Sequence, residues 1–336
     1  MAGPTPDADA GFEARRARRE TARRRLVRQR RIAALAALLL VIGAVAGVAT
    51  LLAGEESDEA SPATAAEKAE RKPPPPAELP RGGREIFPRH RVVAFYGAPQ
   101  NVELGALGVG TPAQAGRKLL EQMRQYRRGG RRLLPAMELI GVVAAGSAQQ
   151  DGSYSYKQPH AVVRRYLKAA RRVKGLLLID IQPGHADFMK LTRHFARFLR
   201  EPDVGLALDP EWYTPGAVPG TVIGSTDSAT VNRVSAYLAR VVKRYRLPEK
   251  LLIVHQFTDS MIRNKRRLKH HTGVALVLNV DGFGDRPNKI SKYVQFTHPR
   301  TGFRSGFKLF YKEDTNTMTP PQVLKLRPRP DVVIYE

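Results

Sequence analysis

Two acidic residues separated by one position, Asp209 and Glu211, follow an apolar run and precede the single tryptophan of the chain, Trp212. Because alternate residues of a strand point to the same side, this spacing directs both carboxylates to one face. Hydrolysis of a glycosidic bond requires two carboxyl groups, since one protonates the leaving oxygen while the other acts as nucleophile or activates water. An indole ring is suited to stacking against a sugar. The pattern therefore predicts carboxylate chemistry on a sugar substrate.

Polar side chains also end the other apolar runs of the sequence. A charge at the mouth of a core costs desolvation free energy unless it is paired or used, so acids at this many strand ends predict a site. The candidates for a second catalytic carboxylate are Asp180, Asp281 and Glu313. The predicted substrate contacts are Tyr96, Glu138, Gln182, Trp212, His255 and Gln256.

Structural roles stay open for three of these residues. Asp180 could cap the loop that begins at Pro183. His255 is as well suited to a hydrogen-bonded structural role as to general base catalysis. Asp281 stands before Gly282, in a pattern that is also typical of a turn.

The sequence predicts no cofactor and no metal site. A metal site formed by His255, Asp180 and Glu138 is the alternative, but no HxH or HExxH spacing supports it. The run GALGVG at 105–110 lacks the G-x-G-x-x-G spacing and no Walker pattern is present, so nucleotide binding is not predicted. The chain has no cysteine, which excludes disulfides, thiolate zinc ligands and cysteine nucleophiles.

The elements that must position these residues begin at Arg91, where short runs rich in Leu and β-branched residues alternate with amphipathic helices. Most runs are apolar on both faces, as is typical of a covered parallel sheet. The eight predicted strands are 92–97, 133–144, 175–182, 204–209, 251–257, 274–282, 307–313 and 332–335.

This alternation predicts the α/β class and a (β/α)8 TIM-like barrel over 91–336, without a final helix because the eighth strand ends the sequence. The segment before Arg91 is expected to cover the resulting gap. An open, doubly wound sheet is the alternative fold.

The N-terminal region predicts a membrane anchor. Residues 32–54 carry no charge, and a helix of about 23 such residues spans the roughly 30 Å of a bilayer core. An Arg-rich tail, 1–31, precedes this segment and acids follow it, so the positive-inside rule places the tail in the cytoplasm and the barrel domain outside. A cleaved signal peptide is the alternative. Residues 55–90, rich in Ala, Glu and Pro, are predicted to form a disordered linker.

The charge of the chain bears on its partners. The formal net charge is +25. Outside the membrane, such a field favours an anionic envelope polymer, a glycan or acidic lipid headgroups, and nucleic acid is not a predicted partner. The alternative is that the basic residues are solvated helix faces.

The motif LALDPEW, which ends at Trp212, resembles the fourth-strand acids of barrel glycoside hydrolases such as chitinases and muramidases. This resemblance implies that Glu211 is the general acid and that Asp209 orients it or tunes its pKa. The retaining enzymes of this kind carry a second glutamate after strand seven, which would correspond to Glu313. Residues 91–336 are also similar to an uncharacterised, envelope-anchored barrel family of actinobacterial type, on the stretches DIQPG, ALDPEW, VHQF, DGFG and GFKLFY.

The predicted function is an envelope glycoside hydrolase acting on a wall or extracellular polysaccharide. The alternative is a non-catalytic barrel that binds an envelope glycan or an assembly partner at the same mouth. Geometry separates the two, because hydrolysis requires a carboxylate pair about 5 to 9.5 Å apart in an open cleft. Acids held in salt bridges would favour binding or a structural role.

Overall fold

The computed structural model describes residues 76–127, 130–298 and 302–336. The predicted cytoplasmic tail, the predicted membrane helix and linker residues 55–75 lie outside these ranges. Within them, no helix has both the length and the apolar character needed to cross a bilayer.

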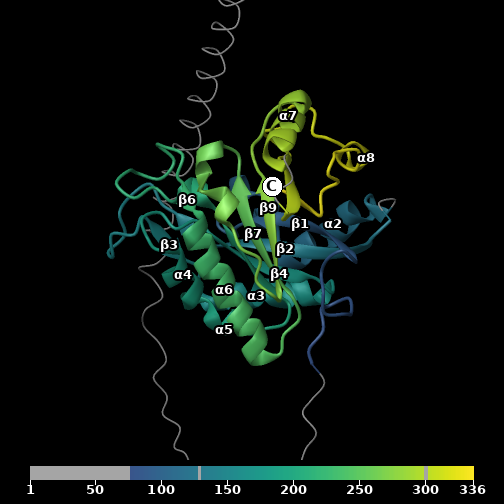
Figure 1. Ribbon diagram of the computed structural model, residues 1–336, viewed down its shortest axis with the longest axis horizontal. Coiled ribbons are helices and arrows are strands. Elements are labelled where there is room, and N and C mark those ends of the chain that lie inside the picture. Colours follow the sequence, from purple (N-terminus) through teal and green to yellow (C-terminus); the bar gives the residue numbers. More distant parts are fainter. Residues whose placement is uncertain (1–75, 128–129, 299–301) are drawn as a thin grey trace, which may run out of the picture. The chain divides into compact units, whose positions relative to one another are not determined.

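Eight parallel strands close into a barrel, which confirms the predicted TIM-like fold (Figure 1). Around the barrel the order is β1, β11, β10, β9, β7, β5, β4 and β2, and β1 pairs with both β11 and β2. This double pairing leaves no open edge between them, so the doubly wound alternative is wrong. The strands are β1 (His90–Gly97), β2 (Arg132–Ala144), β4 (Leu176–Ile181), β5 (Val204–Leu208), β7 (Lys250–Gln256), β9 (Val274–Val280), β10 (Arg304–Leu309) and β11 (Val332–Tyr335).

Helices pack on the outside of the strands (Figure 1). They are α2 (Pro112–Arg124), α3 (His160–Arg172), α4 (Phe188–His194), α5 (Ala196–Leu199), α6 (Ser228–Tyr245), α7 (Arg286–Thr297) and α8 (Pro320–Val323). Local sequence explains where several begin, since Thr111 and Gln114 form a capping box for α2 and Asp227 accepts from a backbone N–H of α6.

The strict alternation of strands and helices is broken between β7 and β9. Short 3₁₀ turns, η5 (Asp259–Met261) and η6 (Lys265–Arg267), flank a two-residue strand β8 (Ile262–Arg263) there. Strand β8 pairs with β6 (Thr226–Asp227), and β3 (Ser155–Lys157) extends β2 in the antiparallel direction.

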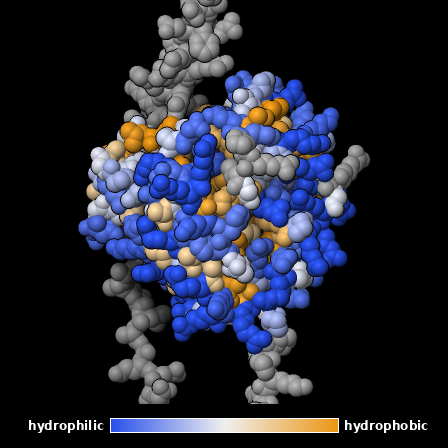
Figure 2. All heavy atoms as spheres, in the orientation of Figure 1, coloured by the Kyte–Doolittle hydropathy of each residue, from blue (hydrophilic) through white to orange (hydrophobic). Residues whose placement is uncertain are grey.

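The core has two layers that follow the alternation of side chains along each strand. Outward residues of β4 such as Leu177 and Ile179 pack under the helices, whereas Leu176 and Leu178 fill the inside of the barrel. The inner layer consists of small and branched residues, including Ala94 and Ala136. The face in view in Figure 2 is largely hydrophilic, with small scattered hydrophobic patches.

The segment before β1 belongs to the folded unit. Leu79, Ile86 and Phe87 are buried among the inward side chains of the barrel. The backbone N–H of Ile86 donates to Glu249, directly before β7, at 2.7 Å, and the compact unit begins at Pro76. The segment therefore closes the amino-terminal end of the barrel, instead of standing in for an eighth helix.

Candidate active site

At the carboxyl end of the barrel every strand directs a polar side chain inward. We call this set the polar layer: Tyr96, Glu138, Asp180, Asp209, His255, Asn279, Asp281, Lys308 and Glu336. In each strand these residues occupy the next inward-facing position after an apolar residue. Ile253 lies two residues before His255, and Ile334 lies two residues before Glu336. The barrel thus brings together side chains that are distant in sequence, as the strand-end pattern predicted.

His255 lies at the centre of the layer, between two carboxylates. Its Nε2 lies 2.9 Å from Oε1 of Glu138, and its Nδ1 lies 3.0 Å from Oδ2 of Asp281. His255 and Glu138 have no exposed surface. Burial opposes the charged imidazolium, but the charge of Glu138 and the hydrogen bonds to both acids raise the pKa of His255 well above its usual value. The two acids therefore hold the imidazole ring in one orientation.

Lys308 is the second cation of the layer, and the sequence did not single it out. Its Nζ donates to Asp281 at 3.1 Å and to Glu336 at 2.7 Å, and it lies 3.8 Å from the centroid of the Tyr96 ring. Although burial favours the neutral amine, these acids raise the pKa of Lys308, and Lys308 together with His255 lowers that of Asp281. A lysine two positions after Gly306 in an otherwise apolar strand was the signal that could have identified it.

Tyr96 and Asp180 of the layer form a second hydrogen-bonded group, together with Gln182 at the end of β4. The Tyr96 hydroxyl donates to Oδ2 of Asp180 at 2.9 Å and accepts from the Gln182 amide at 2.9 Å. Burial, partly offset by the charge of His255, raises the pKa of Asp180 to about 7. Burial and the neighbouring carboxylates of Asp180 and Asp209 also raise the pKa of Tyr96 well above its usual value.

Three buried carboxylate oxygens of the layer have no hydrogen-bond partner among the described residues: Oε2 of Glu138, Oδ1 of Asp180 and Oδ1 of Asp209. Asp209 does not cap the 3₁₀ turn that follows it, η4 (Pro210–Trp212). Burial, with the nearby acids Asp180 and Glu211, raises the pKa of Asp209 well above its usual value. Buried acceptors without partners cost roughly 1–3 kcal/mol each, so packing alone does not explain them.

Ligand atoms of Glu138, Asp180 and His255 lie within 4.8 Å of one another. These are the residues of the metal site that was only the alternative prediction, because no HxH or HExxH spacing links them. The three residues come from β2, β4 and β7, so their proximity arises only when the barrel closes.

Several predicted site residues lie outside the polar layer. Glu211 and Trp212 are on η4, beyond the end of β5. The Gln256 side chain points away from the inward position of His255, and its amide oxygen accepts from Lys265 at 2.7 Å. Strand β10 ends at Leu309, four residues before Glu313, so Glu313 is not at an inward strand position.

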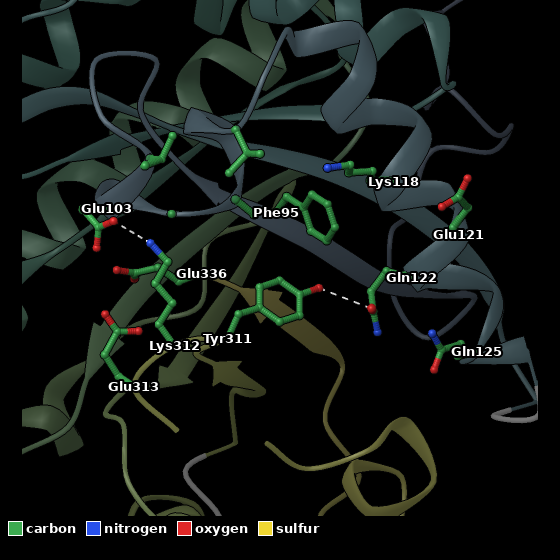
Figure 3. Close-up of a pocket in the computed structure, with 14 residues that line it drawn as sticks. Phe95, Glu103, Lys118, Glu121, Gln122, Gln125, Tyr311, Lys312, Glu313 and Glu336 are labelled. Carbon is green, nitrogen blue, oxygen red and sulfur yellow. Dashed lines mark hydrogen bonds and ion pairs between the residues drawn. The ribbon is translucent and has the colours of Figure 1, made fainter. Parts of the chain in front are cut away.

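A groove of about 430 Å³ lies beside the mouth, between α2 and the residues that follow β10 and β11. Figure 3 shows Phe95 and Tyr311 in this groove, with Lys312 paired to Glu103 and Tyr311 bonded to Gln122. Glu313 and Glu336 also line it. Because Glu336 binds Lys308 as well, it connects the groove with the polar layer.

No protein family and no curated protein matches this sequence. Among solved structures, the chain resembles 2,3-dimethylmalate lyase, a PEP mutase/isocitrate lyase superfamily member, with 11% identity and a TM-score of 0.42 over 74% of this chain and 77% of that one. It also resembles the 7,8-dihydropteroate synthase of Vibrio fischeri ES114, with 9% identity and a TM-score of 0.33 over 74% and 87% of the two chains. At these values, nothing about ligands or reactions follows for this chain.

The prediction of an envelope glycoside hydrolase is wrong. Asp180 has no exposed surface and Asp209 is only 3% exposed, whereas the predicted acid Glu211 lies beyond the layer. A polymer therefore has no access to the buried acids. The alternative, a non-catalytic barrel that binds an envelope glycan or an assembly partner, stays a prediction.

Proposed function

We propose that the chain is an enzyme that transfers protons to and from a small, oxygen-bearing substrate at the polar layer. The observation that carries this proposal is the set of buried carboxylate oxygens without partners on Glu138, Asp180 and Asp209. A fold that needed these acids only for packing would pair them, as it pairs Asp203 with Arg171 at 2.7 Å. Groups left unpaired at a buried, strongly charged site are typical of catalytic centres.

The burial of the layer supports a small substrate. His255, Glu138 and Asp180 are fully covered, and the groove beside them has the volume of a small-molecule pocket. Glu336 lines the groove and also binds Lys308 of the layer, which supports an approach of the substrate from this side. A substrate that enters here meets the ammonium group of Lys308 first.

Asp209 is the proposed base, and Lys308 the proposed electrostatic partner. Asp209 would take the proton from a carbon next to a carbonyl, and the electron pair of the broken C–H bond would move onto the carbonyl oxygen. The positive charge of Lys308 would stabilise this oxyanion in surroundings that exclude water. Reprotonation from Asp209 completes the cycle, so no oxidant or reductant is required.

Hydrogen exchange with solvent tests this proposal. The full chain is incubated in D₂O with a panel of small 2-oxo carboxylic acids, because their carbonyl acidifies the adjacent C–H bond and their carboxylate complements Lys308. We expect NMR to detect deuterium at that carbon in at least one compound, and a loss of at least about 100-fold in Asp209→Asn. Glu85→Gln, an exposed acid before β1 and away from the groove, serves as the control and should keep the rate. Exchange at equal rates in Asp209→Asn would overturn the proposal, as would no exchange across the panel.

A further inference from the structure

We infer that the polar layer binds one divalent transition-metal ion through Glu138, Asp180 and His255. The catalytic meaning of this ion rests on the proposed function, where it would polarise the substrate carbonyl. Binding itself can be measured without turnover.

The geometry of the three residues fits a single ion. Their ligand atoms lie within 4.8 Å of one another. Oxygen and nitrogen ligands at about 2.0–2.2 Å from a common ion stand roughly 3–4 Å apart, so only small side-chain movements are needed. The three residues project from neighbouring and nearby strands of a closed barrel, which holds them at this spacing.

The unpaired oxygens supply a second, independent observation. Oε2 of Glu138 and Oδ1 of Asp180 are buried and have no hydrogen-bond partner among the described residues. A cation between these side chains would contact both oxygens. Among the described residues, no hydrogen-bond donor reaches either oxygen. Oδ1 of Asp209, also without a partner, is a further oxygen of the same layer.

The charges of the layer also favour a cation. Five carboxylates face two cationic side chains within it: Glu138, Asp180, Asp209, Asp281 and Glu336 against His255 and Lys308. Lys308 is already engaged by Asp281 and Glu336. His255 and Lys308 therefore compensate these five acids only in part, and a bound cation would stabilise the ionised forms of Glu138, Asp180 and Asp209.

Asp281 positions His255 for metal binding. Its Oδ2 lies 3.0 Å from Nδ1 of His255 and is itself held by Lys308. This arrangement fixes the proton on Nδ1 and leaves Nε2, which now faces Glu138, as the nitrogen that can bind a metal once its proton leaves. Asp281 is therefore a positioning residue, and not a ligand.

The donor set indicates the kind of ion. Two carboxylates and one imidazole, in a chain without cysteine, favour Zn²⁺ or Mn²⁺ over soft ions such as Cu⁺. Ca²⁺ and Mg²⁺ prefer oxygen ligands alone and are expected to bind this set more weakly.

Calorimetry of the full chain tests the inference after treatment with a chelator. We expect one equivalent of Mn²⁺ or Zn²⁺ to bind, and Glu138→Gln and Asp180→Asn each to abolish this binding. Asp281→Asn should weaken it roughly 10- to 100-fold, as loss of a residue that orients a metal-bound histidine does. Glu313→Gln, a carboxylate change outside the layer, should leave the affinity unchanged.

X-ray absorption on the wild-type chain with the bound ion needs no variant and remains informative if a substitution prevents folding. It should show nitrogen and oxygen neighbours at about 2.0–2.2 Å. The inference is overturned if no such ion binds, or if Glu138→Gln and Asp180→Asn bind it as the wild type does. Metal binding without solvent exchange would remove the proposed proton transfer and keep the metal site. Exchange in the chelated protein would keep the proton transfer and remove the catalytic role of the ion.

Discussion

At the scale of single residues, the fold treats its buried charges in two ways. Asp331 pairs with Arg131, and Asp203 pairs with Arg171. In the polar layer, by contrast, one oxygen each of Glu138, Asp180 and Asp209 has no hydrogen-bond partner among the described residues. The difference separates acids that hold the structure together from acids that are present for a ligand.

Lys250 is a further buried charge, at the opposite end of the barrel. It is 1% exposed, and its Nζ donates to the carbonyls of Glu201 and Val204 at 2.8 and 2.7 Å. Burial lowers the pKa of Lys250 from 10.5 to about 7. Between these two pH values the unfolded chain binds a proton that the folded chain does not bind. The unfolding free energy is therefore expected to fall as the pH decreases through this window.

The substitution Lys250→Met removes this titration. As the pH falls from 10 to 7, we expect the wild type to lose stability relative to the variant. The difference between their unfolding free energies should change by an amount on the order of 3–5 kcal/mol. Urea unfolding of both chains at a series of pH values measures it. Parallel pH curves would show that Lys250 is charged in the folded state throughout.

At the scale of elements, the strands were the most predictable part of the fold. Runs of Leu and β-branched residues locate all eight, and the parity of side chains places Glu138, Asp180 and His255 on one face. Lys308 was missed because β10 was predicted to run to Glu313, which put the functional end of that strand four residues too late. Strand boundaries depend on tertiary pairing, which a sequence pattern does not contain.

The metal-ligand set could not be predicted from spacing, because its residues come from three strands. Glu138, Asp180 and His255 are separated by long stretches of sequence, and no local motif links them. Asp209 and Glu211 show the opposite case, since a local motif placed both acids in one site. The chain leaves its strand after Leu208, so only Asp209 remains at an inward position.

A close approach between β9 and β10 holds the layer in place. A Cβ atom added at Gly306 would lie 2.4 Å from Oδ1 of Asn279, whose amide contacts the ring of His255. We expect Gly306→Ala to cost about 1–3 kcal/mol of unfolding free energy and to weaken metal binding, because Asn279 must move. Gly146→Ala, where an added Cβ meets nothing within 4 Å, is the matched control. Equal stability of the two variants in urea unfolding would contradict this role of β10.

At the scale of the whole molecule, the barrel is closed at its amino-terminal end and charged at its carboxyl end. Leu79, Ile86 and Phe87 complete the core at the first end, whereas the polar layer interrupts it at the second. Membrane anchoring of this domain through residues 32–54 stays a prediction. We expect the polar layer to cost stability, because buried carboxylate oxygens without hydrogen-bond partners destabilise a fold.

The most direct test of this claim compares the unfolding free energies of Asp209→Asn and Asp203→Asn at neutral pH. Both residues are buried acids, but only Asp203 has an arginine partner. Opposite signs are expected: Asp209→Asn stabilises the protein by about 1 kcal/mol or more, because it removes a buried carboxyl group whose Oδ1 has no hydrogen-bond partner among the described residues, and Asp203→Asn destabilises it. If Asp209→Asn destabilises the protein as Asp203→Asn does, the polar layer is structural and the account is contradicted.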